Sequence, residues 1–588
     1  MAKRIILAAF LALAGVTDGP ALASSDIQWR DWSPDVFSAA AKEHKLVLLD
    51  LGAVWCHWCH VMDETTYRDP AIVSLVNDRY VPVRVDEDAY PDLARRYINF
   101  GWPATIIFDA NAVEIVKRRG YVESPTMQVV LKDSFEHPTP NPNQTGNFPA
   151  SSGKGLTGAQ RDAVLASVVY FYDQEYGGWG SGKKFLEPSM MEFALGKALD
   201  GDRVFTVASE QSLEAAADLF DPVWGGVYQY SETPDWQTPH FEKILSAQST
   251  NIRSYAYAFG VFKDVKYRDA ANRIVKYLDD FMINPDGVFY TSQDADLSSA
   301  MTGHDYYPLG DAERRKAGLP NIDKHVYASE NGALISAFLV LYSTTGDEAL
   351  LKKAARAAQW LRAHRALPGG GGFAHGERDN GGPFLADTLA MGDAMLHLYG
   401  ATGDRAWLTQ AVDSGAFIIA HFSDKDDSGF FAAEPHARDA LKPYKQIYEN
   451  LAAARFFNLL FNYSHQDQFR DSSRDAIRSV SSREEIEQYT FNPAFLLADD
   501  EMKKPPLHLT VVGRKDDPAA QALFKAILAA LPLYKQTEWQ DPREGKLPGS
   551  DIEYPDLPRA AAFVCTNNLC SPPVFSSQAL AGELAQAR

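Results

Sequence analysis

The sequence predicts a multidomain protein of the α/β plus all-α class: an α/β domain, then an (α/α)6 toroid, then a small C-terminal α/β lobe. Three observations predict this fold. The chain has 588 residues, which is too long for one hydrophobic core. Short apolar runs alternate with amphipathic ones as far as residue 138, which is typical of an α/β unit. Long helical patterns follow, and the alternation returns after residue 505.

The first 23 residues have the pattern of a secretory signal peptide. Lys3 and Arg4 precede an apolar run over 5–16, and Ala21-Leu22-Ala23 resembles a cleavage site. The run is shorter than the roughly 20 residues that span a bilayer, so we expect no stable membrane insertion, although an uncleaved anchor is the alternative. We therefore predict a periplasmic or secreted protein that begins at Ser24.

Composition limits the classes of partner. The formal net charge of −20 and the isoelectric point near 5.2 argue against nucleic acid or an anionic membrane. With 46% hydrophobic and 23% charged residues, the chain has a globular composition. Its four cysteines form two close pairs, and they are too few to be a disulfide scaffold for a chain of this size.

Residues 24–138 are expected to form the α/β domain. Ser33 and Pro34 suit the N-cap and first position of a helix, and the apolar run 46–51 fits a buried strand. Cys56 and Cys59 follow this strand, at the end where α/β domains place their active sites. The elements expected are helices at 35–44, 70–79 and 91–99, and strands at 46–51, 81–85, 105–108 and 113–117.

The rest of the chain divides into three further segments. A linker is expected over 139–155, because proline, glycine and serine interrupt regular structure there. Helices dominate 156–490, and Gly-rich aromatic turns such as Tyr176-Gly177-Gly178-Trp179 recur between them, which indicates stacked hairpins. At roughly 28 residues per helix and loop, this segment has room for about twelve helices. Residues 491–588 are expected to form the small lobe.

The motif Cys56-His57-Trp58-Cys59-His60 fits several chemistries. A Cys-x-x-Cys pair at the start of a helix can form a redox couple, because the helix macrodipole favours a thiolate there. The same pair followed by His60 fits the attachment pattern of c-type haem, and a zinc site or an inert structural disulfide are further alternatives. In its protonated form, His57 would stabilise the Cys56 thiolate.

The context of the motif favours the redox couple. The segment from Val47 to Cys59 resembles the active-site strand and turn of thioredoxins, in which a cis-proline loop faces the cysteines. This resemblance implies that Cys56 is the nucleophile, that Cys59 resolves the mixed disulfide, and that Asp50 assists the deprotonation of Cys59. Pro103 is the candidate for the cis-proline, because X-Pro bonds are where cis peptides occur.

Two longer motifs extend the resemblance over most of the mature chain. Cys-His-Trp-Cys-His-Val-Met at 56–62 and Pro-His-Phe-Glu-Lys at 239–243 resemble the spermatogenesis-associated protein 20 family and its bacterial relatives. The resemblance implies a thioredoxin-like domain fused to an (α/α)6 barrel shaped like six-hairpin glycosidases and sugar epimerases. After Lys243 the family usually continues with Met-Leu-Tyr-Asp-Asn-Ala, but here the chain reads Ile244-Leu245-Ser246-Ala247-Gln248. Glu330 stands where many members have Trp. Both departures are expected at the barrel cavity.

The expected barrel cavity has candidate residues of its own. A glycosidase or an epimerase needs a proton donor and a base, which His240 and Glu242 could supply, with Trp236 stacking on a sugar ring. The alternative is a polar loop that only shapes the barrel mouth. Asp294 and Asp296 form a further acidic pair, although acids in a turn more often cap it. The candidates are Trp236, His240, Glu242, Lys243, Asp294 and Asp296.

No cofactor or resident metal is expected. Asp424 and Asp426 begin like a calcium loop, but Pro435 stands where its bidentate glutamate should be. Cys565 and Cys570 are expected to form a structural disulfide in an oxidising compartment, and a relay with Cys56 is the alternative.

These observations predict a thiol-disulfide oxidoreductase that acts on a protein or small-molecule disulfide through Cys56 and Cys59. The alternative is a carbohydrate-active enzyme, of the epimerase or glycosidase kind, that works in the barrel with the thioredoxin-like domain as an accessory. A third hypothesis is a non-catalytic receptor that binds a sugar or a peptide in the barrel.

Overall fold

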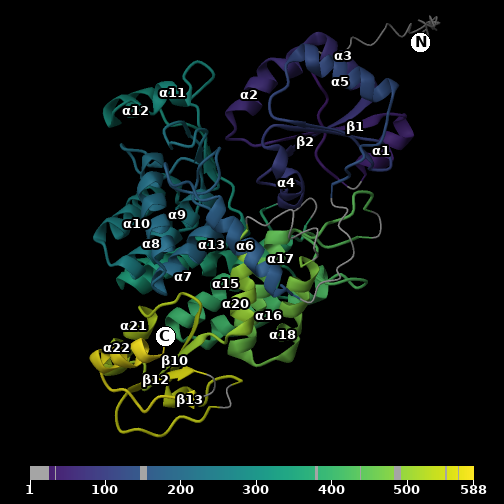
Figure 1. The fold of residues 1–588 in the computed structure, drawn as a ribbon. Coiled ribbons are helices and arrows are strands. Elements are labelled where there is room, and N and C mark those ends of the chain that lie inside the picture. Colours follow the sequence, from purple (N-terminus) through teal and green to yellow (C-terminus); the bar gives the residue numbers. More distant parts are fainter. Residues whose placement is uncertain are drawn as a thin grey trace, which may run out of the picture.

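The computed structural model describes residues 26–33, 35–145, 155–377, 382–436, 439–481, 492–549, 552–566 and 569–587. Figure 1 shows three parts: an α/β domain in purple, a large helical body from blue to green, and a small α/β lobe in yellow. The predicted fold class is confirmed. The expected signal peptide lies outside the described residues. Among the residues described, no helix combines the length and apolar character needed to cross a bilayer.

The thioredoxin-like domain is built on one four-stranded sheet with the order β2-β1-β3-β4. Strand β1 is parallel to β2 and antiparallel to β3, and β3 pairs with β4 as the expected hairpin. Helices cover both faces of the sheet, which is why the β1 run is apolar throughout. The strands are β1 (Leu46–Gly52), β2 (Tyr80–Asp86), β3 (Ala104–Phe108) and β4 (Glu114–Arg119).

The helices of this domain divide between the two faces of the sheet. One face is covered by α1 (Val36–Glu43) and α4 (Pro91–Tyr97), and the other by α2 (His57–Glu64), α3 (Pro70–Arg79) and α5 (Ser124–Glu136). Short helical turns lie at η1 (Thr66–Arg68) and η2 (Ile98–Phe100).

The first residues of the expected linker lie on the thioredoxin-like domain. The backbone N–H of Asn141 donates to the carbonyl of Glu114, and the N–H of Thr145 donates to the Glu114 carboxylate. The linker was predicted over 139–155, of which 146–154 lie outside the described residues.

The helical body is a closed double ring. Its inner helices contact one another in the order α7, α9, α13, α15, α17 and α20, and α20 contacts α7 again. Each inner helix pairs with an outer one. The inner helices are α7 (Pro188–Leu199), α9 (Leu245–Phe262), α13 (Ala328–Thr345), α15 (Leu385–Thr402), α17 (Ile447–Ser464) and α20 (Ala494–Lys503). The outer helices are α6 (Gly158–Tyr170), α8 (Arg203–Ala215), α10 (Val265–Tyr277), α14 (Glu348–His364), α16 (Arg405–Phe422) and α18 (Asp467–Ser479).

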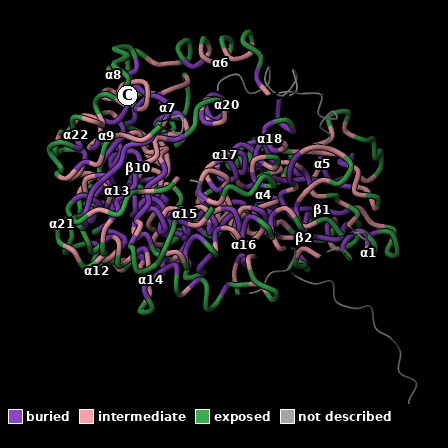
Figure 2. The backbone as a smooth tube through the Cα atoms, turned by 90° about the horizontal axis from the view of Figure 1, so that it is seen from below, coloured by how far each residue is buried: buried purple, intermediate pink, exposed green. Residues whose placement is uncertain are grey.

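This ring is the predicted (α/α)6 toroid, but its last inner helix lies beyond the predicted end of the toroid. The sequence was divided at 490 and 491, yet α20 lies beyond that point and completes the inner ring between α17 and α7. The apolar pattern of α20 is short, and only its packing assigns it to the ring. Figure 2 shows that buried residues concentrate along inner helices such as α13 and α15.

The recurring Gly-rich turns are small hairpins between an outer helix and the next inner one. Each is pinned by one β-bridge, for example Phe220 to Val227. Gly225 and Gly226 within this turn both have φ of +74°, and a Cβ on Gly225 would lie 2.7 Å from the carbonyl oxygen of Arg273. Glycine is therefore required by conformation and by close packing at this point. The other bridges join Tyr172 to Trp179, Ile283 to Phe289, Ala366 to Phe373 and Ser423 to Phe430.

Longer loops at one end of the toroid carry short strands and helices. Two small sheets form there, β5 with β6, and β7 with β8 and β9. The elements are β5 (Tyr230–Ser231), β6 (Pro239–His240), β7 (Lys243–Ile244), β8 (Ser292–Gln293), β9 (Ile322–Asp323), α11 (Gly303–Tyr306), α12 (Asp311–Ala317), η3 (Ala216–Leu219) and η4 (Leu278–Met282).

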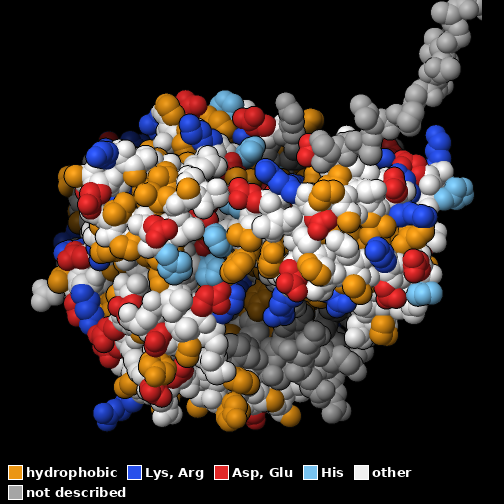
Figure 3. Space-filling view, turned by 90° about the horizontal axis from the view of Figure 1, so that it is seen from above, with side chains coloured by type: hydrophobic (Ala, Val, Ile, Leu, Met, Phe, Trp, Pro, Cys, Tyr) orange, Lys and Arg blue, Asp and Glu red, His pale blue; other side chains and the backbone are white. Residues whose placement is uncertain are grey.

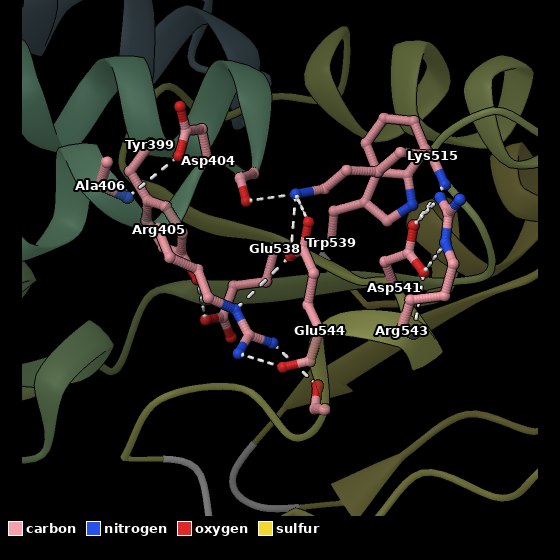
Figure 4. Close-up of polar contacts among 12 residues, drawn as sticks. Tyr399, Asp404, Arg405, Ala406, Lys515, Glu538, Trp539, Asp541, Arg543 and Glu544 are labelled. Atoms are coloured by element: carbon pink, nitrogen blue, oxygen red, sulfur yellow. Dashed lines mark hydrogen bonds and ion pairs between the residues drawn. The ribbon is translucent and has the colours of Figure 1, made fainter.

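The C-terminal lobe closes the opposite end of the toroid, where the inner helices finish. Its sheet has the order β11-β10-β12-β13. Glu538 accepts a hydrogen bond of 2.9 Å from the Tyr399 hydroxyl, and Lys515 donates to the carbonyl of Gly403 (Figure 4). The elements are β10 (Leu507–Val512), β11 (Lys535–Gln540), β12 (Ala561–Thr566), β13 (Leu569–Cys570), α21 (Pro518–Leu528), α22 (Ser577–Gln586) and η5 (Pro542–Glu544). The Cys565–Cys570 disulfide joins β12 to β13.

Candidate active site at the domain interface

The Cys56–Cys59 disulfide lies at the start of α2, directly after β1. Cys56 is the N-cap of the helix, and its Sγ accepts the backbone N–H of Cys59 at 3.2 Å. A Cβ on Gly52 would lie 3.2 Å from the Cys59 sulfur, so the small residue lets the end of β1 approach the disulfide. The helix N-terminus therefore acts on Cys56, as the sequence predicted.

Pro103 and Asp50, which were expected beside the disulfide, have the expected backbone conformation and burial. The Trp102-Pro103 peptide bond is cis, and Trp102 packs on the small apolar cluster that includes Cys56. Asp50 is buried in β1, where it accepts hydrogen bonds from the Tyr67 hydroxyl (3.1 Å) and from Arg84 Nε (2.9 Å). Burial raises the pKa of Asp50 to about 6, although the charge of Arg84 opposes this rise.

The toroid covers the disulfide. Ile244, in β7, packs on the cluster formed by Ala53, Trp55 and Cys56 with Cys59. As a result Cys56 is only 4% exposed. We call the end of the toroid that faces the thioredoxin-like domain, where α9, α13, α15 and α17 begin, the barrel mouth. Figure 3 shows histidine and acidic side chains near the boundary between the two parts on this side of the molecule.

Acidic residues of the barrel mouth contact both histidines of the motif. His57 Nδ1 lies 2.5 Å from Asp296 Oδ2, and His60 Nε2 lies 3.8 Å from Asp294 Oδ2. The hydrogen bond to Asp296 raises the pKa of His57, whereas burial opposes the rise. Burial raises the pKa of Asp294 to about 7. Asp296 also accepts the N–H of Gly303, so this acidic pair both caps its turn and faces the motif.

Comparison with known proteins supports the thioredoxin-like domain. A family model described as "Thioredox_DsbH: Protein of unknown function, DUF255" matches residues 21–130. Human spermatogenesis-associated protein 20 is 23% identical over 547 residues, covering 70% of each chain. The mouse protein of that name is 27% identical over 311 residues, covering 47% of this chain and 39% of its own. Over most of its length the chain is similar to spermatogenesis-associated protein 20.

Solved structures resemble part of the chain. They include a D-mannose isomerase (TM-score 0.46, 12% identity, 61% of this chain and 99% of that chain). A sugar epimerase from a ruminal bacterium has a TM-score of 0.46 and 12% identity, over 59% of this chain and 98% of that chain.

The family motif Pro-His-Phe-Glu-Lys at 239–243 leads into Ile244, the residue that covers the disulfide. Lys243 was expected to line the barrel cavity, but this is wrong: it is fully buried and its Nζ lies 2.7 Å from Asp221 Oδ2. Trp236 is also in the core, 1% exposed, with its Nε1 donating to the carbonyl of Tyr176. Both residues hold the loop in place, and neither is free to bind a sugar.

The two other barrel candidates in this loop lie close to each other. His240 stacks on Tyr230 with ring centroids 4.3 Å apart, and its Nδ1 lies 3.4 Å from Glu242 Oε2. Glu242 is 2% exposed, and its charge contributes to the raised pKa of His57. Glu242 therefore belongs to the acidic surroundings of the Cys-x-x-Cys motif.

The toroid axis carries a polar network that sequence reasoning missed. Every inner helix contributes to it. Arg455 lies 2.6 Å from carboxylate oxygens of both Glu192 and Glu501, and Arg253 lies 3.1 Å from Glu192. Ser336 donates to Asp393, which also pairs with His397. These residues come together only because six inner helices pack around one axis. Their charges are paired with one another.

Two acids at the start of inner helices were also missed as site residues. Glu330 and Glu449 occupy the third positions of α13 and α17, and burial raises the pKa of each to about 8. Glu330 is one of the two places where the resemblance implies a departure from the family pattern. Ala247, at the third position of α9, lies in the other. Both departures from the family pattern therefore lie at the barrel mouth.

Replacing Asp296 with Asn should loosen the contact between the barrel mouth and the motif. The pair needs protonated His57 and ionised Asp296, so it is lost as the pH rises through the raised pKa of His57. We expect the His57 pKa to fall in Asp296→Asn and dithiothreitol to reduce the disulfide about fivefold faster, the equivalent of roughly 1 kcal/mol. NMR titration of His57 and reduction kinetics measure the two effects.

The matched control for this variant is Asp305→Asn, in the neighbouring turn, whose carboxylate contacts Thr302. It should change neither quantity. An unchanged His57 pKa in Asp296→Asn would contradict the pairing.

Proposed function

We propose that this protein is a thiol-disulfide oxidoreductase that exchanges disulfides with a protein or small-molecule partner through Cys56 and Cys59. The observation that carries the proposal is the disulfide at the N-terminus of α2, beside cis-Pro103 and above the buried carboxyl of Asp50. Together these groups suit the making and breaking of a sulfur-sulfur bond.

The exchange proceeds in two displacement steps. In the reducing direction, the Cys56 thiolate attacks one sulfur of the substrate disulfide, and the other substrate sulfur leaves as a thiolate that takes up a proton. The Cys59 thiol gives its proton to Asp50, directly or through water, and attacks Cys56 Sγ. The second substrate sulfur then leaves as a thiol, the substrate has gained two electrons, and Cys56–Cys59 is a disulfide. The oxidising direction reverses these steps.

The barrel mouth acts as the gate of this site. Since Ile244 and Asp296 cover the motif, a sulfur of the partner reaches Cys56 only when the barrel mouth separates from it or admits a small substrate. A carbohydrate-active site in the barrel is not part of the proposal. Its expected Trp236 and Lys243 lie in the core, and the toroid axis is occupied by paired charges.

Export completes the proposal. The signal-like residues 1–23 support action in the periplasm or outside the cell, where a disulfide exchange partner is oxidised.

The test is to trap the intermediate with Cys59→Ala in the exported chain. The lone Cys56 thiolate forms a mixed disulfide that no internal thiol resolves, so we expect partners that migrate with the protein on non-reducing gels and are released by dithiothreitol. The Cys56→Ala/Cys59→Ala double variant keeps the second disulfide and is the control, in which no partner should appear. Absence of any protein or glutathione adduct in Cys59→Ala, or equal amounts of adduct in the control, would contradict the proposal. Mass spectrometry of the same sample should find Ser24 as the first residue.

A further inference from the structure

A group of carboxylates spans the interface between the thioredoxin-like domain and the barrel mouth. Asp86 and Asp88 lie at the carboxyl end of β2, and Asp323 lies in β9 of the toroid. Each offers one carboxylate oxygen, and these three oxygens all lie within 4.8 Å of one another. Glu330, at the start of α13, is close enough to raise the pKa of Asp88 further. Asp86 and Asp88 of one domain and Asp323 of the other thus bring three carboxylates together.

Several oxygens of this group have no hydrogen-bond partner. Asp323 is only 7% exposed, and its Oδ2 is unpartnered, while its Oδ1 accepts the N–H of His325 at 3.0 Å and lies 2.5 Å from His325 Nδ1. Asp86 Oδ1 and Glu330 Oε2 are buried and unpartnered as well. Within the described ranges, no lysine or arginine forms an ion pair with Asp86, Asp88 or Asp323. Buried carboxylate oxygens without a donor are costly, because they have lost water and gained nothing in return.

The geometry points to a binding site for a hard divalent cation, of the Ca²⁺ type, formed by Asp86, Asp88 and Asp323 with Glu330 beside them. All three ligands offer oxygen, which such cations prefer. Two oxygens bound to one Ca²⁺ at about 2.4 Å can stand up to about 4.8 Å apart, so three oxygens that lie within 4.8 Å of one another are close enough to share one ion. Mg²⁺ demands a smaller and more regular octahedron, so it should bind more weakly. This site lies far in sequence from the loop at Asp424 that the sequence analysis had weighed.

A second group of possible ligands, His60, Asp294 and Asp296, fits such a cation less well. Asp296 already accepts hydrogen bonds from His57 and from the N–H of Gly303, and His60 Nε2 lies 2.9 Å from the carbonyl of Val54. Both carboxylate oxygens of Asp296 and the Nε2 of His60 are thus engaged by the protein itself, whereas Oδ2 of Asp323 has no partner.

The cation would join the two domains next to the disulfide. Asp88 accepts a 2.8 Å hydrogen bond from Trp55 Nε1, and Trp55 directly precedes Cys56. The main-chain carbonyl of Asp88 also faces His375 Nε2 of the toroid, at 2.6 Å. A cation held between Asp88 and Asp323 therefore clamps the barrel mouth over Cys56, and it should slow reduction of the disulfide.

The experiment is calorimetric titration of the oxidised full-length protein with CaCl₂ at neutral pH. We expect binding at one site, and we expect Asp323→Asn to weaken it by about tenfold or more, since charge count sets such affinities. Asp86→Asn, on the other domain, should do the same. The matched control is Glu449→Gln, which removes a buried acid with an unpartnered oxygen at the third position of α17. It should leave Ca²⁺ affinity unchanged.

The outcomes separate the alternatives. No heat of binding at millimolar CaCl₂, or equal affinity in Asp323→Asn and Asp86→Asn when both are folded by circular dichroism, would overturn the proposal. Loss of binding in Asp294→Asn alone would assign the cation to the other group and overturn it too. Saturating Ca²⁺ should also slow reduction by dithiothreitol severalfold in the wild type and not in Asp323→Asn. Because binding is measured on the disulfide form, its result is independent of whether the protein exchanges thiols.

Discussion

Replacing Asp221 with Asn should lower the free energy of unfolding by about 3–5 kcal/mol, because it leaves two buried cations without their counter-charge. Asp221 is fully buried, and its Oδ2 lies 2.7 Å from both Lys243 Nζ and Arg314 Nη1, whose side chains are also fully buried. Burial lowers the pKa of Lys243 to about 8 even with Asp221 beside it. Without the aspartate, Lys243 would lose its proton or draw water into the core, and either response costs stability.

The effect of Asp221 extends to the site, because Lys243 is the anchor of β7. The next residue, Ile244, covers the disulfide, and the preceding one, Glu242, faces His57. Asp221→Asn should therefore expose Cys56 to alkylation after reduction more than the wild type does. Chemical denaturation followed by circular dichroism measures stability, and mass spectrometry measures alkylation.

The control for Asp221 is Asp269→Asn, which removes an exposed partner of Arg268 and should change stability by less than about 1 kcal/mol. A loss in Asp221→Asn no greater than in this control would show that the buried triad contributes nothing beyond a surface ion pair.

Local patterns were sufficient for the elements around the disulfide. The run 46–51 is apolar throughout because helices cover both faces of the sheet, and it forms strand β1. The strands and helices that follow were predicted from the pattern of apolar residues within each segment. The same holds for Pro103, whose cis bond follows from residue type and from the resemblance to thioredoxins. Motif spacing also places Cys56 at the start of a helix, since the strand and the helix are separated by a short turn.

The surroundings of the disulfide depend on contacts that no local pattern carries. His57 and Asp296 are 239 positions apart, and their pairing exists only because the barrel mouth docks on the thioredoxin-like domain. The same docking gathers Asp86 and Asp323, although the acidic run after β2 was a signal that could have been read, since β1 and β2 are parallel and end at the same sheet edge. Trp236 and Lys243 were misjudged for the opposite reason. Polar and aromatic residues near each other in sequence suggested a cavity, but their loop folds back and buries them.

Replacing Asp50 with Asn should slow the resolving step of the exchange by about 100-fold, the usual scale of general acid-base catalysis. The Cys59 thiol must lose its proton before it attacks, and Asp50 is the buried carboxyl expected to accept it. Because burial raises the pKa of Asp50 to about 6, the wild-type rate should increase as the pH rises through 6 and the carboxylate forms. In Asp50→Asn this rise should disappear.

The raised pKa of Asp50 also makes the free energy of unfolding depend on pH, and here a rise in pH is unfavourable. The folded protein holds the Asp50 proton more tightly than the unfolded chain does, so ionisation of this group weakens the fold as the pH rises from about 4 to about 6. Asp50→Asn removes that contribution. The variant should therefore lose stability less steeply than the wild type between these pH values, which denaturant titrations at a series of pH values would measure.

The control for Asp50 is Asp63→Asn, because Asp63 pairs with the same arginine from a half-exposed position. The measurement is single-turnover release of glutathione from a chain carrying it on Cys56, followed across this pH range. If Asp50 acted only by positioning Arg84, both variants would slow release alike and both would keep the pH dependence. Loss of the pH dependence in Asp50→Asn alone would assign the proton to Asp50, and equal pH profiles in all three proteins would exclude Asp50 as the base.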